Sequence, residues 1–282
     1  MTSDKEKILN KNNNLKITSD ELMPVNMLWI GGPLSPIEQL SALSFKAAGH
    51  RVVLHTYDGV FNAPDNIELV DAASTMDFAL VQSLRERRSG SYALASDYFR
   101  YALQAQNAGL WADMDMICVK PIHKQKQAIM GFERPDSINC AILHLDSELP
   151  IIGELLGIFQ EGYIPQWVDP KIARKRRLKR WLPNRRIRPA IMPWGTYGPQ
   201  ALTNLARKHG IINQAERKPV FYPLDQHRAH DMFDANISLE SIIQEGTLAV
   251  HLWNESLKQL GLKETQPPRN SPLGKLMKRY GL

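Results

Sequence analysis

The sequence predicts an α/β protein, a single Rossmann-like domain with a mostly parallel central sheet, and three observations carry this prediction. Short apolar runs alternate with helical patterns along most of the chain. The first strand, helix and second strand follow one another within residues 25–57, a spacing typical of parallel strands joined by a crossover helix. The 282 residues are 43% hydrophobic and 23% charged, which suits a globular protein with a sizeable core.

The first elements are defined by their stop signals. Residues 25–30 are apolar and end at Gly31-Gly32-Pro33, so they predict a buried strand followed by a tight turn. Ser35-Pro36 opens a helical pattern that Gly49 ends, and residues 51–57 predict the second strand.

Later elements follow the same logic. Residues 91–108 predict a helix closed by Gly109, and residues 110–119 predict one strand that Lys120-Pro121 ends. The remaining alternation predicts strands at 128–132, 139–145, 220–222 and 248–253 and helices at 148–160 and 199–208.

The two ends of the chain predict tails. Residues 1–22 are polar and rich in Asn and Lys, so we expect a flexible N-terminal tail, and residues 266–282 predict a basic C-terminal tail beyond a domain at 23–265. The N-terminal segment lacks the apolar core of a signal peptide. With only two cysteines, Cys118 and Cys140, we expect a cytoplasmic protein with reduced thiols.

The net charge of +6 comes from one stretch of the sequence. Residues 171–188 hold ten Lys and Arg residues and no Asp or Glu, whereas the rest of the chain carries 25 basic and 29 acidic residues. Ile172, Leu178, Trp181 and Leu182 are interleaved among these charges, so the stretch suits an anionic membrane surface. A solvated, flexible loop is the alternative. No nucleic acid is expected as a partner, because no recognition motif accompanies the basic residues.

Asp113 and Asp115 are the sharpest candidates for chemistry. They stand two residues apart between apolar flanks, and in an extended segment both side chains project from the same side. Two like charges so placed favour a cation between them, and Mg²⁺ or Mn²⁺ takes oxygen ligands and bridges to phosphate groups. The pair therefore predicts a metal site for a diphosphate, with an edge bearing two solvated carboxylates as the alternative.

Asp97 and Arg100 supply a second pair on the preceding helix. Their i, i+3 spacing places them on one helix face. A fixed carboxylate and guanidinium there can bind hydroxyls and phosphate, and a surface ion pair is the alternative.

Five segments, taken in order, resemble a known family. Residues 95–100 (ASDYFR) and 109–115 (GLWADMD) resemble the A-S-D-x-x-R and G-G-x-Y-x-D-x-D block of the DXD sugar-binding glycosyltransferases. This family includes α-1,6-mannosyltransferase-like enzymes, α-1,4-galactosyltransferases and glucosylating bacterial toxins. Residues 28–32 (LWIGG), 197–203 (YGPQALT) and 250–254 (VHLWN) match further family segments, so the resemblance covers residues 25–255.

The resemblance implies a GT-A fold, a nucleotide-sugar donor with Mn²⁺ or Mg²⁺, and glycosyl transfer with retention of configuration. It implies that Asp113 and Asp115 approach the metal and the diphosphate or ribose, and that Asp97 and Arg100 hold the donor sugar. Leu110 and Trp111 depart from the family, which has Gly and Tyr at these places.

The resemblance also assigns two residues outside the Asp-rich segments. It implies that Trp29 lies near the nucleotide base and that His251 is the last ligand of the metal or diphosphate; for His251 a buried strand histidine is the alternative. It identifies no catalytic residue on the acceptor side.

The sequence thus predicts a retaining, metal-dependent hexosyltransferase that moves a sugar from a nucleotide donor, expected to be UDP-linked, to a saccharide or lipid-linked saccharide. We expect it to act in surface polysaccharide synthesis, in the cytoplasm or peripherally on the inner face of the plasma membrane. One alternative is another metal-dependent phosphoryl or nucleotidyl transferase. The other is a basic α/β protein that binds membranes or nucleic acid through residues 171–188.

Overall fold

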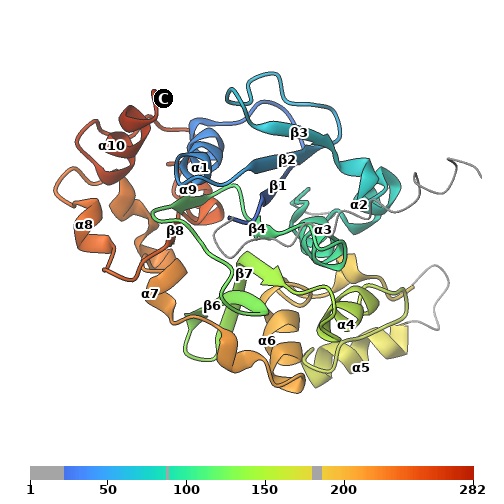
Figure 1. Ribbon diagram of the computed structural model, residues 1–282. Coiled ribbons are helices and arrows are strands. Elements are labelled where there is room, and N and C mark those ends of the chain that lie inside the picture. The colour runs from blue at the N-terminus through green and yellow to red at the C-terminus, as the bar shows by residue number, and fades with distance from the viewer. Residues whose placement is uncertain (1–21, 87–88, 180–185) are drawn as a thin grey trace, which may run out of the picture.

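A six-stranded sheet forms the centre of the molecule (Figure 1). The computed structural model describes residues 22–86, 89–179 and 186–282. The strands run in the order β3-β2-β1-β4-β7-β6. Their bounds are β1 (Val25–Trp29), β2 (Val52–Thr56), β3 (Glu68–Asp71), β4 (Leu110–Ala112), β6 (Ala128–Arg134) and β7 (Ser137–Leu145). Strands β1 to β4 pair in parallel and β7 is antiparallel to both its neighbours, so the predicted α/β class with a mostly parallel sheet is confirmed, and the sheet is compatible with a Rossmann-like fold.

A second, two-stranded sheet corrects the prediction of one strand at 110–119. After β4 the chain turns, with the Met116 amide donating to the Asp113 carbonyl at 3.0 Å. It then enters β5 (Met116–Cys118), which pairs with β8 (Ala249–His251) in antiparallel fashion. Both flanks of the turn are apolar because each is buried in a different sheet, and this hides the turn from a hydrophobicity pattern.

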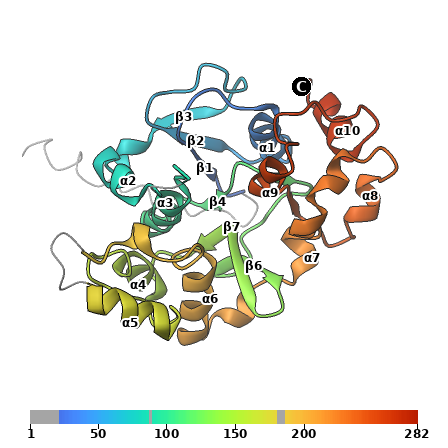
Figure 2. The same cartoon turned by 180° about the vertical axis from the view of Figure 1, so that it is seen from behind.

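Helices cover both faces of the large sheet (Figures 1 and 2). Alternate residues of β4 point to opposite faces: Leu110 packs in one hydrophobic cluster with Phe45 of α1, and Trp111 in another with Phe99 of α3. The helices are α1 (Pro36–Ala47), α2 (Phe78–Leu84), α3 (Ala93–Ala105), α4 (Ile151–Gly157), α5 (Pro170–Lys179), α6 (Pro199–Lys208), α7 (Lys218–Phe221), α8 (Leu239–Ile242), α9 (Asn254–Gln259) and α10 (Pro272–Arg279).

The C-terminal part of the chain differs from its prediction. Instead of a basic tail, residues 266–282 contain α10, which buries Leu273, Leu276 and Met277 in a cluster shared with the outer face of α1. The basic residues of α10 lie on its exposed side, so counting charge alone misses the apolar face.

One further prediction is wrong, and another falls outside the described residues. The strand predicted at 220–222 is the short helix α7, because Pro219 in its first turn fixes a helical start. Residues 1–21 of the predicted N-terminal tail lie outside the described residues. Within the described ranges, every helix is too short or too polar to cross a bilayer.

Candidate metal and donor site

The candidate site lies where the large sheet changes direction. From β1 the chain continues outward through β2 and β3, and β4 then returns to the other side of β1. Parallel sheets bind ligands outside the carboxyl ends of the strands at such a switch point. Trp29 ends β1 and Asp113 follows β4, so two of the residues singled out from the sequence lie at this edge.

Asp113, Asp115 and His251 come together at the switch point. Each offers one ligand atom, and these atoms lie within 4.8 Å of one another. The pairing of β5 with β8 produces this meeting, since Met116 lies opposite His251 and the Leu252 amide donates to the Asp115 carbonyl at 2.9 Å. Asp113 and Asp115 thus converge through a turn, and not through the extended segment predicted from their spacing.

Asp115 is held on both carboxylate oxygens. His251 Nε2 lies 3.2 Å from Asp115 Oδ1, and the Asn254 amide donates to Oδ2 at 2.8 Å. Burial by itself raises the pKa of Asp115, but the charge and hydrogen bond of His251 and the Asn254 amide bring it below its usual value. Burial by itself lowers the pKa of His251. The charge and hydrogen bond of Asp115 outweigh burial, with smaller contributions from Asp113 and Glu133, so the pKa of His251 lies above its usual value.

Asp113 is fixed from the opposite side by Trp111 and Arg100. Trp111 Nε1 donates to Asp113 Oδ1 at 2.7 Å, and Arg100 Nη1 lies 3.2 Å from the same oxygen. Burial raises the pKa of Asp113; Arg100 opposes this and the nearby Asp115 charge adds to it. Asp113 Oδ2 makes no hydrogen bond to any described residue, so it is the carboxylate oxygen open to a ligand.

Arg100 is the buried cation of the site. Only 6% of its side chain is exposed, and its Nη1 donates to the Cys140 carbonyl at 2.6 Å. Its guanidinium carbon lies 5.0 Å from the Trp111 ring centre, a cation–π contact. Burial favours the neutral form, but the charges of Asp113 and Asp97 raise the pKa of Arg100 further above its usual value. The pair predicted from i, i+3 spacing is therefore a buried ion network and not a surface ion pair.

Asp97 faces the start of α6. It lies 3.5 Å from Arg100 Nη2, and a methyl group at Gly198 would lie 2.7 Å from Asp97 Oδ1, so a side chain at this position would have to displace the Asp97 carboxylate. The Tyr101 hydroxyl fixes the same segment by donating to the Tyr197 carbonyl at 3.0 Å. Burial raises the pKa of Asp97 to about 7, although Arg100 opposes the shift.

The donor set fits a hard divalent cation. An octahedral ion with bonds of about 2.1 Å holds neighbouring ligands about 3 Å apart. Asp115 Oδ1 and His251 Nε2 are 3.2 Å apart, which matches two such neighbouring positions, and a carboxylate oxygen of Asp113 offers a third ligand. The two carboxylates are ligands that suit Mg²⁺ or Mn²⁺, whereas the imidazole is more typical of transition-metal sites.

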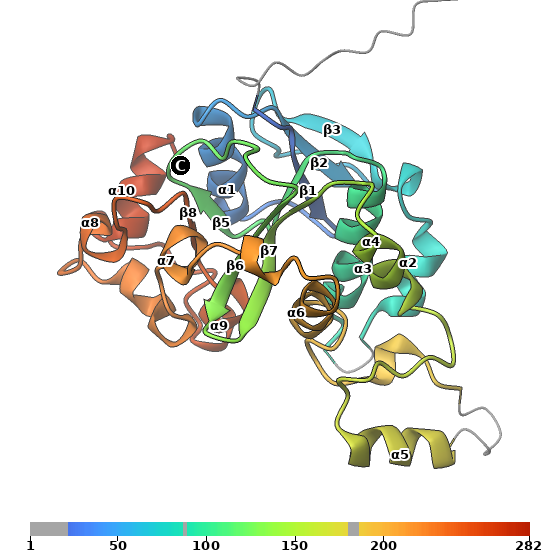
Figure 3. The same cartoon turned by 60° about the horizontal axis from the view of Figure 1, so that its bottom comes forward.

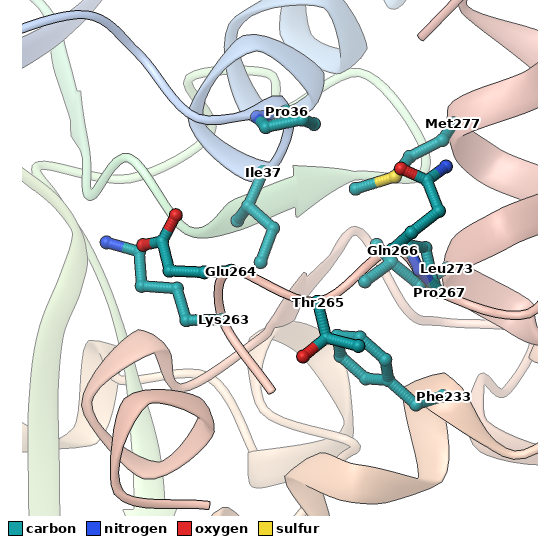
Figure 4. Close-up of a pocket in the computed structure, with 10 residues that line it drawn as sticks. All are labelled: Pro36, Ile37, Phe233, Lys263, Glu264, Thr265, Gln266, Pro267, Leu273 and Met277. Carbon is teal, nitrogen blue, oxygen red and sulfur yellow. The ribbon is translucent and has the colours of Figure 1, made fainter. Parts of the chain in front are cut away.

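A polar network extends from the metal ligands to Trp29. Asn254, whose amide binds Asp115, donates through its side chain to the fully buried Glu38 at 2.8 Å. Lys263 Nζ lies 3.0 Å from the same Glu38 oxygen and 5.8 Å from the Trp29 ring centre. Figure 4 shows Lys263 in the C-terminal segment, beside Pro36 and Ile37 at the start of α1. Lys263 therefore contacts both Trp29 and Glu38, and Glu38 is linked through Asn254 to the candidate metal ligand Asp115.

Glu38, Asn254 and Lys263 were missed by the sequence reasoning. Glu38 has a local signal only as the third helical residue after Ser35, where its side chain accepts the Ser35 amide at 2.9 Å. Its second role depends on contacts 216 residues away, which no local pattern contains.

The chain was compared with known proteins. No protein-family model matches it, and no curated protein matches it at a significant level.

Proposed function

We propose that this protein is a metal-dependent glycosyltransferase of GT-A architecture that moves a hexosyl group, with retention, from a nucleotide sugar to a saccharide or lipid-linked saccharide. The observation that carries this proposal is the convergence of Asp113, Asp115 and His251 beside Arg100 at the sheet's switch point. A cation and a guanidinium next to one another favour a diphosphate, the leaving group of such a donor.

Different residues of the site would bind different parts of the nucleotide sugar. Asp113, Asp115 and His251 would hold Mn²⁺ or Mg²⁺, which when bound neutralises charge on the leaving diphosphate. Asp97 and Arg100 bind the sugar and phosphate oxygens from the other side. Trp29 offers its ring to the nucleotide base, for which UDP is the expected nucleotide.

The exposed side chains of helix α5 favour an acceptor that is located at a membrane. Its exposed side chains include Lys171, Arg174, Lys175 and Arg177, and Leu178 is 64% exposed among them. Exposed cations with an apolar side chain between them favour an anionic lipid surface. We place the activity at the inner face of the plasma membrane, in surface polysaccharide synthesis. Trp181 and Leu182, counted toward this surface from the sequence, lie outside the described residues.

The test is a thermal-shift screen with UDP, GDP and CMP sugars, each with and without Mn²⁺. A ligand at 100 times its Kd stabilises the native state by about 2.7 kcal/mol. We expect a rise in Tm with one nucleotide class, only with Mn²⁺, and lost in Asp115→Asn. Product analysis by mass spectrometry then distinguishes sugar release from phosphoryl or nucleotidyl transfer.

Asp136→Asn is the matched control, because Asp136 is exposed in the turn between β6 and β7. It should leave every shift unchanged. A folded wild-type protein that shifts with no donor, or shifts equally without Mn²⁺, would exclude the proposed function.

A further inference from the structure

A cavity of about 540 Å³ is lined in part by residues of β6, α7 and α9. Trp253 forms part of its lining, and its ring centre lies only 4.0 Å from that of His251. Trp253 therefore contacts both the cavity and a candidate metal ligand. The cavity belongs to none of the contacts assigned above to the nucleotide donor.

The backbone of Trp253 adopts a conformation that is unfavourable for an aromatic residue. Its φ of 60° and ψ of 58° lie in the left-handed region, which a bulky aromatic residue rarely adopts. Such a conformation persists where surrounding contacts over-determine it. Here Trp253 Nε1 donates to the Leu224 carbonyl at 3.0 Å, and the next residue, Asn254, binds Asp115. These contacts fix the position of the indole beside His251.

The acidic and basic side chains that line the cavity are paired with one another. Glu133 lies 3.7 Å from Arg134, and Lys218 is bonded to Asp225, so the two carboxylates and two cations form two pairs. Asn139 Nδ2 further fixes Glu133 by donating to it at 2.7 Å. A charged ligand gains little from a lining whose charges are already paired.

The neutral groups of the lining are those that recognise hydroxyls. Gln226, Gln259 and Ser256 offer both donors and acceptors, and the Trp253 ring and Leu260 offer apolar surface beside them. A pyranose ring has this mixture, with hydroxyls on its rim and C–H groups on its face. Pockets select ligands through a few placed polar groups on an otherwise apolar wall.

We propose that this cavity is the acceptor subsite and that it takes a neutral saccharide, stacked on Trp253 and bound through its hydroxyls by Gln226, Gln259 and Ser256. The inference rests on the proposed function, since it names the substrate class of the same site. It is independent of which nucleotide the donor carries.

Ser256→Trp tests the subsite, because Ser256 is half-buried in α9 and an indole there would fill the cavity. The probe is an array of defined neutral oligosaccharides, read with labelled protein in the presence of UDP and Mn²⁺. We expect wild-type protein to bind a subset of glycans and Ser256→Trp to bind them at least tenfold more weakly. Gln259→Ala, at an exposed position, should weaken binding about fivefold, the loss of one hydrogen bond.

Ser83→Trp is the control, since Ser83 is an exposed serine in α2 outside the cavity lining. The donor-induced Tm shift is measured in parallel and should be the same in all three variants, which separates this test from that of the donor site. Donor shifts present in every protein but glycan binding absent from the wild type, or unaffected by Ser256→Trp, would overturn the acceptor subsite. Loss of the donor shift in the wild type as well would overturn the proposed function.

Discussion

The candidate site and helix α5 both concentrate charge, but they do so in opposite ways. In the site, two carboxylates flank Arg100, whose side chain is 6% exposed, and a third carboxylate faces His251. In α5, Lys171, Arg174, Lys175 and Arg177 are exposed, and residues 170–215 contain no Asp or Glu. Figure 3 shows α5 at the end of the molecule, beyond α4 and α6.

This difference in burial determines whether each set of charges affects folding stability or binding to a partner. Buried opposite charges are strongly coupled, weakly screened by salt and costly to separate. Exposed like charges contribute little to folding and attract an anionic partner at low salt. We therefore expect the site to respond to substitution through stability and pKa, and α5 to respond through binding alone.

The largest effect is expected for Arg100→Met. The substitution leaves Asp97 and Asp113 buried without their cation, and breaking a buried pair costs about 3–5 kcal/mol of unfolding free energy. Urea unfolding at pH 8 measures this. Because burial raises the pKa of Asp97 to about 7, this carboxyl group is protonated at pH 5, and the loss of unfolding free energy should be smaller there.

Arg51→Met is the matched control for that measurement. Arg51 lies 3.6 Å from Glu68 with 68% of its side chain exposed, so its loss should cost under about 1 kcal/mol. Equal costs for Arg51→Met and Arg100→Met would show that burial does not distinguish the site's ion pairs.

A pH-dependent effect is expected for Asp97→Asn. The pKa of Asp97 is about 7 in the folded protein and about 3.9 in an unfolded chain. Between these values the folded protein holds a proton that the unfolded chain has released, so wild-type stability falls as pH rises from 4 to 7, by up to about 1.4 kcal/mol per pH unit. Asparagine cannot titrate, so Asp97→Asn should lack this slope.

The measurement is urea unfolding of both proteins at pH 5, 6, 7 and 8. Subtracting one profile from the other removes the groups that they share. Parallel profiles would mean that Asp97 is ionised throughout, with its charge compensated by Arg100.

The smallest effect on stability is expected for Arg174→Glu/Lys175→Glu in α5. Both side chains are exposed, so the unfolding free energy should change by less than about 0.5 kcal/mol. Each cation near an anionic membrane contributes about 1 kcal/mol, so binding to phosphatidylserine-containing vesicles should fall at least tenfold. Sedimentation of the protein with vesicles measures this, and 0.5 M NaCl should weaken the wild type similarly.

Lys258→Glu/Lys278→Glu changes the net charge equally at exposed positions in α9 and α10. If this control loses vesicle binding to the same extent, net charge and not α5 governs association. Vesicle binding unchanged in both variants, together with binding to nucleic acid, would assign α5 to that other partner.

Local patterns predicted most of the sheet and part of the site. Strands β1 and β2 and helices α1 and α6 lie within two residues of their expected positions, because periodicity and Gly or Pro stop signals are local properties. The Asp113-Met114-Asp115 pattern likewise pointed to a metal site, and its two carboxylates do lie with His251. Strand β3 was missed because its sequence, ELVD, is too short and polar to give a signal.

By itself, the sequence determined the α/β class, the acidic pair and the basic stretch, since each depends on residues close together in the chain. Only the tertiary structure decided that the acidic pair sits on a turn between two sheets, that His251 meets Asp115 across 136 positions, and that Glu38 anchors Asn254. The physical reason is that burial and pairing arise from contacts between distant segments, which the order of residues along one strand or helix does not contain.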